Sequence, residues 1–286
     1  NVNGVLKQRN DAGVSPFDSA VQGGDAVWEG LRLYEGKIFR LEAHLDRLIH
    51  SAQALAFAQI PAKELIKEEI RKTLLANGMR DGAHLRLTLT RGVKFTSGMD
   101  PRLNTAGPTL IVLAEWKAPV YGSAGIRLIT SAIRRFAPDG LDPKIHHNNL
   151  LQSILAKIQA NHAGADDALM LDPRGFVAET NATHVFVVEA GVVRTPQVLH
   201  CPEGITRDSV LRLCAAEGIP HSVCDLSLSE VYRADEVFCT GTMGELVPVF
   251  DVDGRRIGTG AEGAMTTRLK TLFRAFVRAN DDEVLV

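Results

Sequence analysis

Two side chains in this sequence have the chemistry that catalysis through a covalently held cofactor requires. Lys144 lies in GLDPKIHHNN, a turn marked by glycine and proline that comes just before residues of helical pattern. Glu179 lies in GFVAETNATHVFVV, at the end of a predicted strand pair joined through a Pro-Arg-Gly turn. A lysine amine can form a Schiff base, and a carboxylate can keep a pyridine nitrogen protonated. Taken singly, each residue is more often a solvated surface group.

Two other stretches place glycine and threonine at turns that could bind an anion. CPEGITRDSVLRLC puts Ile205 and Thr206 after a glycine at the start of a predicted amphipathic helix, where backbone N–H groups and the helix dipole favour phosphate. CTGTMGELVPV puts Thr242 after an apolar strand. The first turn could equally be an ordinary helix cap and the second a strand-ending turn. Convergence of both turns on one phosphate is therefore a hypothesis.

Composition narrows the classes of partner. The chain has 286 residues, a formal net charge of -2 and a pI near 6.5, which give no general attraction for nucleic acid or anionic membrane. No apolar run reaches the roughly 18 to 20 residues of a membrane span, and no signal peptide is visible at the start. The four cysteines form no CxxC pair. We expect a cytoplasmic protein with reduced thiols and a small-molecule partner.

Adjacent histidines raise the question of a metal site. His146 and His147 follow Lys144 closely. Neighbouring side chains on a helix or turn point in different directions, and no carboxylate stands at the spacing of a known metal motif. We therefore expect no metal.

The hydrophobic pattern predicts an α/β (α+β) chain in two domains. In the first half it indicates a hairpin, two helices and two further strands, over residues 26–40, 41–56, 62–78, 84–92 and 109–116. In the second half it indicates strands over residues 126–133, 167–172, 184–191, 236–241 and 246–252. Helices are indicated over residues 148–164, 206–218 and 265–279. We expect a small α/β domain over 1–116, an interdomain linker over 117–125 and a larger domain over 126–286.

Five stretches in one order resemble the fold type IV pyridoxal-phosphate-dependent aminotransferases, the class that contains branched-chain and D-amino-acid aminotransferases. They run through nearly the whole chain: WEGLRLYEGKIFRLEAHLDRL, KIHHNNLLQSILAKIQA, ALMLDPRGFVAETNATHVFVV, TPQVLHCPEGITRDSVL and ADEVFCTGTMGELVPV. The resemblance implies that Lys144 bonds to pyridoxal 5'-phosphate and that Glu179 faces the pyridine nitrogen. It also implies a phosphate site made by Arg47 in AHLDRL together with the two turns, at Ile205, Thr206 and Thr242.

The same resemblance implies an architecture and a reaction. The fold type IV subunit has a small α/β domain and a larger domain built round a pseudo-barrel, and it forms a homodimer. Its reaction is a ping-pong transamination: an amino acid leaves its amino group on the cofactor, and a second 2-oxo acid, 2-oxoglutarate, accepts it. Lys144 would move the proton between the substrate carbon and the cofactor carbon.

The residues expected to contact substrate depart from the branched-chain pattern. Branched-chain enzymes carry tyrosines at the positions of Gly23 and Asn149; Asn149 remains a candidate donor to the ring oxygen of the cofactor. Arg86 lies in a His-Leu-Arg run where those enzymes have Tyr-Ile-Arg, and it could bind the substrate carboxylate or be paired structurally. Trp28 and Met243 are candidate substrate contacts, although Trp28 equally fits a buried core.

The substrate expectation follows from these matches and departures. D-amino-acid enzymes trap the carboxylate with an arginine and a histidine after TRG, a spacing this chain lacks, although Arg102 lies farther along. We expect an aminotransferase of branched-chain type, with apolar L-amino-acid and 2-oxo-acid substrates and no nucleic-acid or membrane partner. Three alternatives stay open: a D-amino-acid or (R)-amine transaminase on the same fold, an aminodeoxychorismate-lyase-like enzyme, and a non-catalytic phosphate-ligand binding protein. Lys144 and Glu179 argue against the last, because a phosphate binder needs neither.

Overall fold

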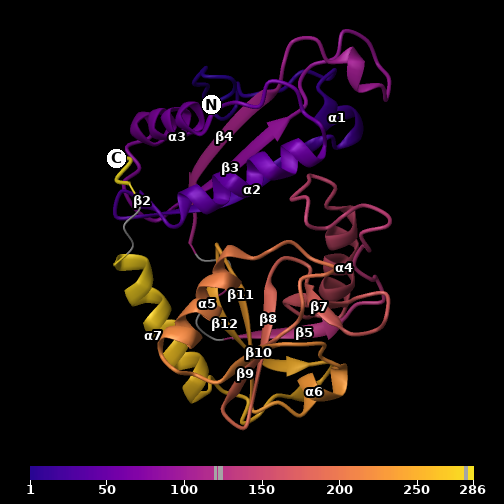
Figure 1. The fold of residues 1–286 in the computed structure, drawn as a ribbon, viewed down its shortest axis with the longest axis vertical. Helices are drawn as coiled ribbons and strands as arrows, with labels where there is room; N and C mark the ends of the chain where they lie inside the picture. The colour runs from indigo at the N-terminus through magenta and orange to yellow at the C-terminus, as the bar shows by residue number, and fades with distance from the viewer. Residues whose placement is uncertain (119–120, 122–124, 280–282) are drawn as a thin grey trace. The chain divides into compact units, whose positions relative to one another are not determined.

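The computed structural model describes residues 1–118, 121, 125–279 and 283–286. These residues form two compact units (Figure 1). Unit 1 contains residues 1–118, 145–149 and 283–286, and unit 2 contains residues 150–279 and the described residues from 121 to 144. The domain bounds expected from the sequence stay a prediction, and most of the expected linker, 117–125, lies outside the described residues.

Unit 1 is built on an antiparallel sheet in the order β2-β1-β3-β4. Its strands are β1 (Ala26–Tyr34), β2 (Lys37–Ile38), β3 (Ala83–Thr90) and β4 (Thr109–Trp116). Its helical segments are α1 (Ser19–Gly23), α2 (Leu41–Ala54), α3 (Lys63–Ala76) and the short 3-10 helix η1 (Pro101–Leu103). The hairpin, both long helices and both later strands are confirmed, whereas α1 and η1 were not predicted.

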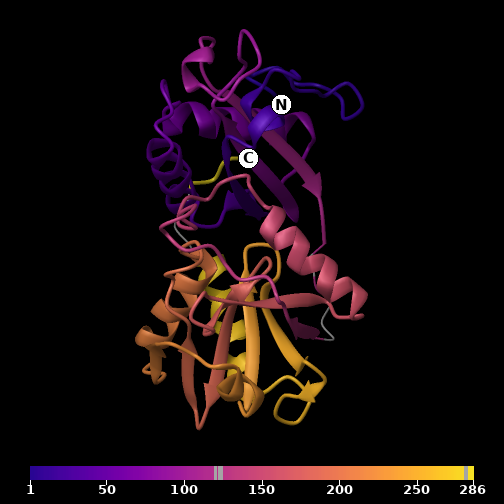
Figure 2. The same cartoon turned by 90° about the vertical axis from the view of Figure 1, so that its right-hand side faces the viewer.

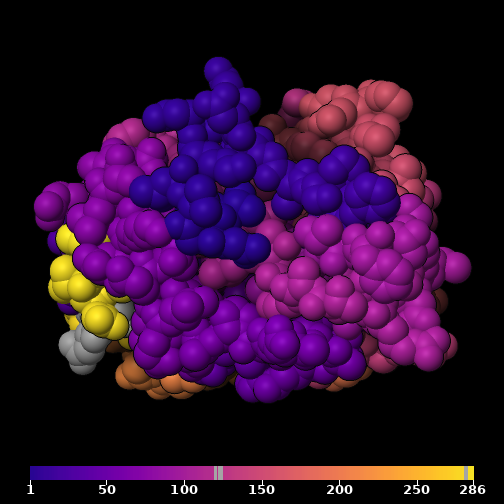
Figure 3. Space-filling view, turned by 90° about the horizontal axis from the view of Figure 1, so that it is seen from above, coloured from indigo at the N-terminus to yellow at the C-terminus, as the bar shows by residue number. Residues whose placement is uncertain are grey.

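Alternation along the strands decides which side chains form the core of unit 1. Leu31 of β1 and Leu85 of β3 are fully buried on the same face of the sheet. They join Leu45 of α2 and Ile70 of α3 in one hydrophobic cluster. The N-terminal residues run beside β4, where the Asn3 backbone N–H donates to the Leu110 carbonyl at 2.8 Å. Figure 3 shows this N-terminal segment in indigo across one face of unit 1.

A glycine in the β1–β2 turn allows the C-terminal residues to dock on unit 1. Glu35 and Gly36 have φ angles of 49° and 82°, as a tight hairpin turn requires. The Leu285 backbone N–H donates to the Gly36 carbonyl at 2.9 Å. A Cβ atom on Gly36 would lie 2.4 Å from the Val286 oxygen, so this close approach requires glycine.

Unit 2 contains a mixed sheet that curls into a half-barrel (Figure 1). Within the described residues the strand order is β10-β9-β8-β11-β12-β5-β6-β7, and β13 pairs with β12. The strands are β5 (Ile126–Thr130), β6 (Asp167–Leu171), β7 (Val177–Thr180), β8 (His184–Glu189), β9 (Val192–Thr195), β10 (His221–Val223), β11 (Glu236–Gly241), β12 (Glu245–Val252) and β13 (Arg255–Arg256). This two-unit architecture confirms the predicted α/β fold type IV class.

The helices of unit 2 are α4 (Leu151–His162), α5 (Ile205–Ala216), α6 (Leu228–Tyr232) and α7 (Ala264–Arg278). Ala156 and Ala160 of α4 pack against Met170 of β6. Figure 2 shows α4 beside the sheet of unit 2. The strands and long helices expected in this half are confirmed, whereas β9, β10, β13 and α6 were not predicted. A signal for α6 was present, because Ser227 and Glu230 form a capping box. Among the described helices, none is both long and apolar enough to cross a membrane.

The residues just after Lys144 are not helical, which differs from the sequence expectation. The helix begins at Leu151 rather than at residue 148. Residues 145–149 instead lie along β1, where the Trp28 N–H donates to the His146 carbonyl at 3.0 Å and the Asn148 N–H to the Ala26 carbonyl at 2.8 Å. On β1, β2 pairs with Leu33 and Tyr34, so the part of this edge nearer Ala26 is open to residues 145–149.

The core of unit 1 gives a direct test of the fold. Leu45→Ala should lower the free energy of unfolding by about 2 to 5 kcal/mol, because it leaves a cavity between α2 and the sheet. Both tryptophans, Trp28 and Trp116, lie in unit 1, so their fluorescence during urea unfolding reports on this unit. Leu65→Ala on α3, where the leucine is 53% exposed, is the control and should change the value by less than about 0.5 kcal/mol. Equal losses in both variants would contradict this core.

Candidate active site

Lys144 lies in a turn held by its own local residues. Its backbone N–H donates to Asp142 Oδ1 at 3.0 Å, an Asx-type turn that fixes the chain after Pro143. The Lys144 side chain is about half exposed, and its Nζ lies 3.7 Å from Oε1 of Glu203. Glu203 directly precedes Gly204, the N-cap of α5. The structure therefore brings the candidate catalytic amine to the start of the helix that carries Ile205 and Thr206.

The start of α5 has no side chain as a cap. Gly204, the N-cap residue, is extended and has no side chain with which to cap the helix. A Cβ atom on Gly204 would lie 2.2 and 2.4 Å from ring atoms of His184, so only glycine fits beside that histidine. Ile205 and Thr206 are both buried in the first turn. A helix end of this kind suits an anion such as a phosphate.

The second Gly-Thr turn follows β11 and is connected to the same histidine. Thr242 and Met243 lie between β11 and β12. Thr240, near the end of β11, is the cross-strand partner of His184. Its hydroxyl oxygen is buried and has no hydrogen-bond partner in the described part of the chain. An unsatisfied buried hydroxyl is costly, so it marks this strand end as a place where a polar group fits.

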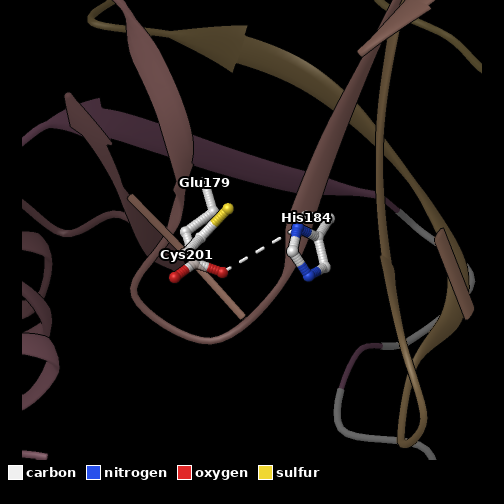
Figure 4. A group of neighbouring side chains, drawn as sticks. All are labelled: Glu179, His184 and Cys201. Atoms are coloured by element: carbon white, nitrogen blue, oxygen red, sulfur yellow. Dashed lines mark ion pairs between the residues drawn. The ribbon is translucent and has the colours of Figure 1, made fainter. Parts of the chain in front are cut away.

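Glu179 is a buried carboxylate with a cationic partner. It lies on β7, opposite Met170 of β6, with a side chain that is 9% exposed. Its Oε1 forms an ion pair with Nη2 of Arg135 at 2.8 Å, and its Oε2 lies 4.0 Å from Nδ1 of His184. Figure 4 shows Glu179, His184 and Cys201 pointing toward one another. Arg135 compensates the charge of Glu179, which would otherwise be expensive to bury.

The same three residues have side chains that can bind metals. Ligand atoms of Glu179, His184 and Cys201 lie within 4.8 Å of one another. A metal requires the deprotonated thiolate, but burial, together with the nearby Glu179 charge, raises the pKa of the Cys201 thiol. Arg135 also places a positive charge against the carboxylate. Both features disfavour a metal cation among these three residues.

In unit 1, Arg47 is held by a second buried glutamate. Glu29 on β1 is 0% exposed and lies on the side of the sheet that faces α2. Arg47 Nε and Nη2 donate to its two oxygens, each at 2.7 Å. His44 Nδ1 lies 2.6 Å and His146 Nδ1 3.1 Å from the same carboxylate. Burial alone would raise the pKa of Glu29, but Arg47 and His146 hold that pKa well below its usual range.

Trp28 and Arg86 lie together on the other side of that sheet. The Arg86 guanidinium is 3.6 Å from the centre of the Trp28 ring, and its Nη2 donates to Asn148 Oδ1 at 2.7 Å. Burial lowers the pKa of Arg86 to about 10. Within the described residues no carboxylate pairs with Arg86. Its structural partners are the Asn148 amide and the Trp28 ring. A desolvated guanidinium of this kind can bind a carboxylate in two-point contact.

Two other candidates have polar partners within unit 1. Asn149 Nδ2 donates to the Gly24 carbonyl at 3.2 Å. Arg102, on η1, has a side chain that is 90% exposed and pairs with Asp100. Their expected roles toward cofactor and substrate stay predictions.

The candidate residues divide between the units. Unit 2 contains Lys144, Glu179, Ile205, Thr206, Thr242 and Met243. Unit 1 contains Trp28, Arg47, Arg86 and Asn149. Sequence reasoning missed Glu29, Arg135, His184 and Glu203, which contact these candidates. Strand alternation held a signal for Glu29, a carboxylate at a core-facing position of β1, whereas nothing in the sequence pairs Arg135 with Glu179.

Comparison with known proteins fixes the family. The model of the family described as amino-transferase class IV matches residues 26–252. The branched-chain-amino-acid aminotransferase of Pseudomonas aeruginosa is 35% identical over 280 residues, covering 94% of this chain and 90% of that protein. The chain belongs to the branched-chain aminotransferase family of class IV.

Other members of the branched-chain aminotransferase family agree in sequence and fold. Branched-chain-amino-acid aminotransferase-like protein 2 of Arabidopsis thaliana is 57% identical over 267 residues, which cover 93% of this chain and 48% of that protein. The chain thus spans about half the length of this relative. The solved branched-chain amino acid aminotransferase of Escherichia coli superposes with a TM-score of 0.90 at 29% identity. That match covers 99% of this chain and 98% of the solved chain.

The Arg135–Glu179 pair should contribute strongly to stability. Arg135→Leu leaves the Glu179 carboxylate buried without its guanidinium and should cost about 3 to 5 kcal/mol. Arg134→Leu, at the exposed neighbouring residue, is the matched control and should cost less than about 0.5 kcal/mol. Scanning calorimetry of both variants measures the difference. Similar melting temperatures would show that the pair does not stabilise unit 2.

The buried histidines of unit 1 should make its stability depend on pH. Burial lowers the pKa of His44, and burial together with the Arg47 charge lowers that of His146. Below the ordinary histidine pKa of about 6.5, the unfolded chain binds more protons than the folded unit. The free energy of unfolding therefore decreases as the pH is lowered. The urea midpoint by tryptophan fluorescence should therefore be lower at pH 5.5 than at pH 7.5. His44→Gln should reduce this difference, whereas His50→Gln, at an exposed position, should leave it unchanged.

Proposed function

We propose that this chain is a pyridoxal-phosphate-dependent transaminase that moves the amino group of an apolar, branched-chain type L-amino acid to 2-oxoglutarate. The observation that carries the proposal is one continuous set of contacts in unit 2. Lys144 lies beside Glu203, the adjacent Gly204 packs on His184, and His184 neighbours Glu179. This set supplies an amine, an anion-binding helix start and a buried carboxylate, the three parts that pyridoxal phosphate chemistry requires.

The residues present fit the cofactor. The start of α5, where the N-cap is Gly204, and the buried Thr240 hydroxyl, which has no hydrogen-bond partner among the described residues, suit a polar group. Glu179, a buried carboxylate beside Arg135, suits a ring N–H. Pyridoxal phosphate, when bound, supplies an electron sink for the pair of electrons left at the substrate carbon. The resemblance to fold type IV enzymes supports Arg47, Ile205, Thr206 and Thr242 as the residues that would hold its phosphate.

Lys144 has two tasks in this proposal. Its amine would hold the cofactor covalently between turnovers and, once displaced by the substrate amine, take and return the proton at the substrate carbon. The Asx-type turn at Asp142 sets the backbone from which the amine reaches. Lys144 is also the last residue of unit 2 before the chain continues as residues 145–149 of unit 1, so its backbone is anchored on both sides.

The remaining candidates would orient the reactants. Glu179 would hold the proton on the ring nitrogen, and Arg135 would keep that carboxylate charged. Arg86 would bind the substrate carboxylate from its position over Trp28. Trp28 and Met243 would contact the substrate, and Asn149 the ring oxygen of the cofactor. Because one product leaves before the second 2-oxo acid enters the same site, the kinetics would be ping-pong.

The proposal extends to assembly and location. We propose a homodimer, which the resemblance to fold type IV enzymes supports. We propose a cytoplasmic location, which is supported by the four cysteines, Cys201, Cys214, Cys224 and Cys239, all free thiols.

Absorption spectroscopy tests the function directly. The purified protein with pyridoxal phosphate should show a visible band that bleaches on addition of L-leucine and returns on addition of 2-oxoglutarate. Lys144→Ala should still fold and bind the cofactor yet lose transamination by several orders of magnitude. Bleaching by D-alanine alone would move the assignment to D-amino acids. The absence of any band would overturn the cofactor proposal, and wild-type turnover in Lys144→Ala would remove that lysine from the mechanism.

A further inference from the structure

The Glu29 carboxylate in unit 1 accepts hydrogen bonds from three side chains. Its Oε1 accepts from Arg47 Nε at 2.7 Å and from His146 Nδ1 at 3.1 Å. Its Oε2 accepts from Arg47 Nη2 at 2.7 Å and from His44 Nδ1 at 2.6 Å. An ionised carboxylate offers about four lone-pair sites, so these donors fill it. Both histidines must carry their proton on Nδ1 to make these contacts.

This saturation fixes the orientation of the Arg47 guanidinium. Arg47 meets Glu29 through its Nε and Nη2 edge, so the planar group cannot rotate without breaking two charge-assisted hydrogen bonds. The Nη1 end of the fork then faces away from Glu29. His44 stands three residues before Arg47 on α2, on the same face of the helix, and contacts the same carboxylate.

Glu29 also holds the segment that follows Lys144. His146 stacks on Trp28 with ring centroids 4.3 Å apart, while its Nδ1 contacts Glu29. The His146 backbone N–H donates to Ser51 Oγ at 3.0 Å, and its carbonyl accepts from the Trp28 N–H at 3.0 Å. The carboxylate thus joins β1, α2 and residues 145–149 at one buried point.

We propose that Glu29 is a positioning residue, which orients Arg47 toward the cofactor phosphate and steadies the segment after Lys144 through His146. This inference rests on the proposed function, because it takes Arg47 as the phosphate arginine. Glu29 itself is fully buried, so it touches neither cofactor nor substrate. Its effect is transmitted through the fixed guanidinium.

A simpler role for Glu29 would give the opposite sign. If Glu29 only neutralised Arg47, removing its charge would leave a net positive charge and tighten the binding of a phosphate dianion. If it orients Arg47, its removal weakens that binding. Glu29→Gln separates the two, because the amide keeps the size of the side chain but offers one oxygen and an NH2 group that opposes the donors around it.

The experiment titrates the full chain, freed of cofactor, with pyridoxal phosphate and, separately, with pyridoxal, which lacks the phosphate. Glu29→Gln should weaken pyridoxal phosphate by about tenfold or more and change pyridoxal by less than about twofold. Glu42→Gln, which removes an exposed α2 carboxylate paired with Lys63 and Lys67, is the control and should change neither. A merely structural role would weaken both ligands alike, and this result, or unchanged or tighter binding of pyridoxal phosphate, would overturn the inference.

Two further variants keep the outcomes separate. Arg47→Gln should weaken pyridoxal phosphate at least as much as Glu29→Gln. If Arg47→Gln weakens the binding of pyridoxal phosphate and Glu29→Gln does not, the proposed function stands and the inference on Glu29 fails. If Arg47→Gln leaves this binding unchanged, both the phosphate role of Arg47 and the inference on Glu29 fail. Should circular dichroism show that Glu29→Gln is unfolded, Glu29→Asp carries the same test. It keeps the charge but shortens the reach, and the same selective loss is expected.

Discussion

Each unit of this protein depends on a buried carboxylate whose charge is compensated by an arginine. Glu29 pairs with Arg47 in unit 1, and Glu179 pairs with Arg135 in unit 2. An isolated buried charge would cost several kcal/mol, and in each unit the arginine offsets much of that cost. In unit 1 the compensation also brings orientation, because Arg47 is paired with Glu29 through its Nε and Nη2 edge and its plane is therefore fixed. His44 and His146 contact the same carboxylate, whereas in unit 2 His184 lies beside Glu179.

The chain passes from unit 2 to unit 1 directly after Lys144. Residues 145–149 close the open edge of β1 with backbone hydrogen bonds, whereas Lys144 and the helix from Leu151 belong to unit 2. The lysine thus stands at the point where the chain leaves one unit for the other, and both neighbouring segments are tied to regular structure. A group that must repeatedly form and release a covalent bond gains from such an anchored backbone, since the amine returns to the same position after each exchange.

Much of the fold could be predicted from sequence because its signals are local. Leu41, Leu45 and Leu48 repeat at helical spacing, and the alternation through β1 and β3 marks the core face. The short elements β9, β10 and β13 have too few residues for a periodic pattern, so they were missed. The helix expected after Lys144 begins later than its pattern suggests, because residues 145–149 satisfy their backbone groups on β1 instead. Tertiary hydrogen bonds outweigh local helix preference there.

The sequence by itself determined the chemistry that this chain carries: a lysine in a turn, a carboxylate at a strand end, two Gly-Thr turns, and an order of motifs that matches the branched-chain aminotransferase family. Those features are written in residue types and short spacings, which one-dimensional reasoning can use. Only the tertiary structure decided that Arg135 compensates Glu179, that His184 connects α5 to the end of β11, and that Glu29 holds Arg47 and His146 together. These contacts join residues tens of positions apart, and their partners follow from which faces of which strands and helices are buried against one another.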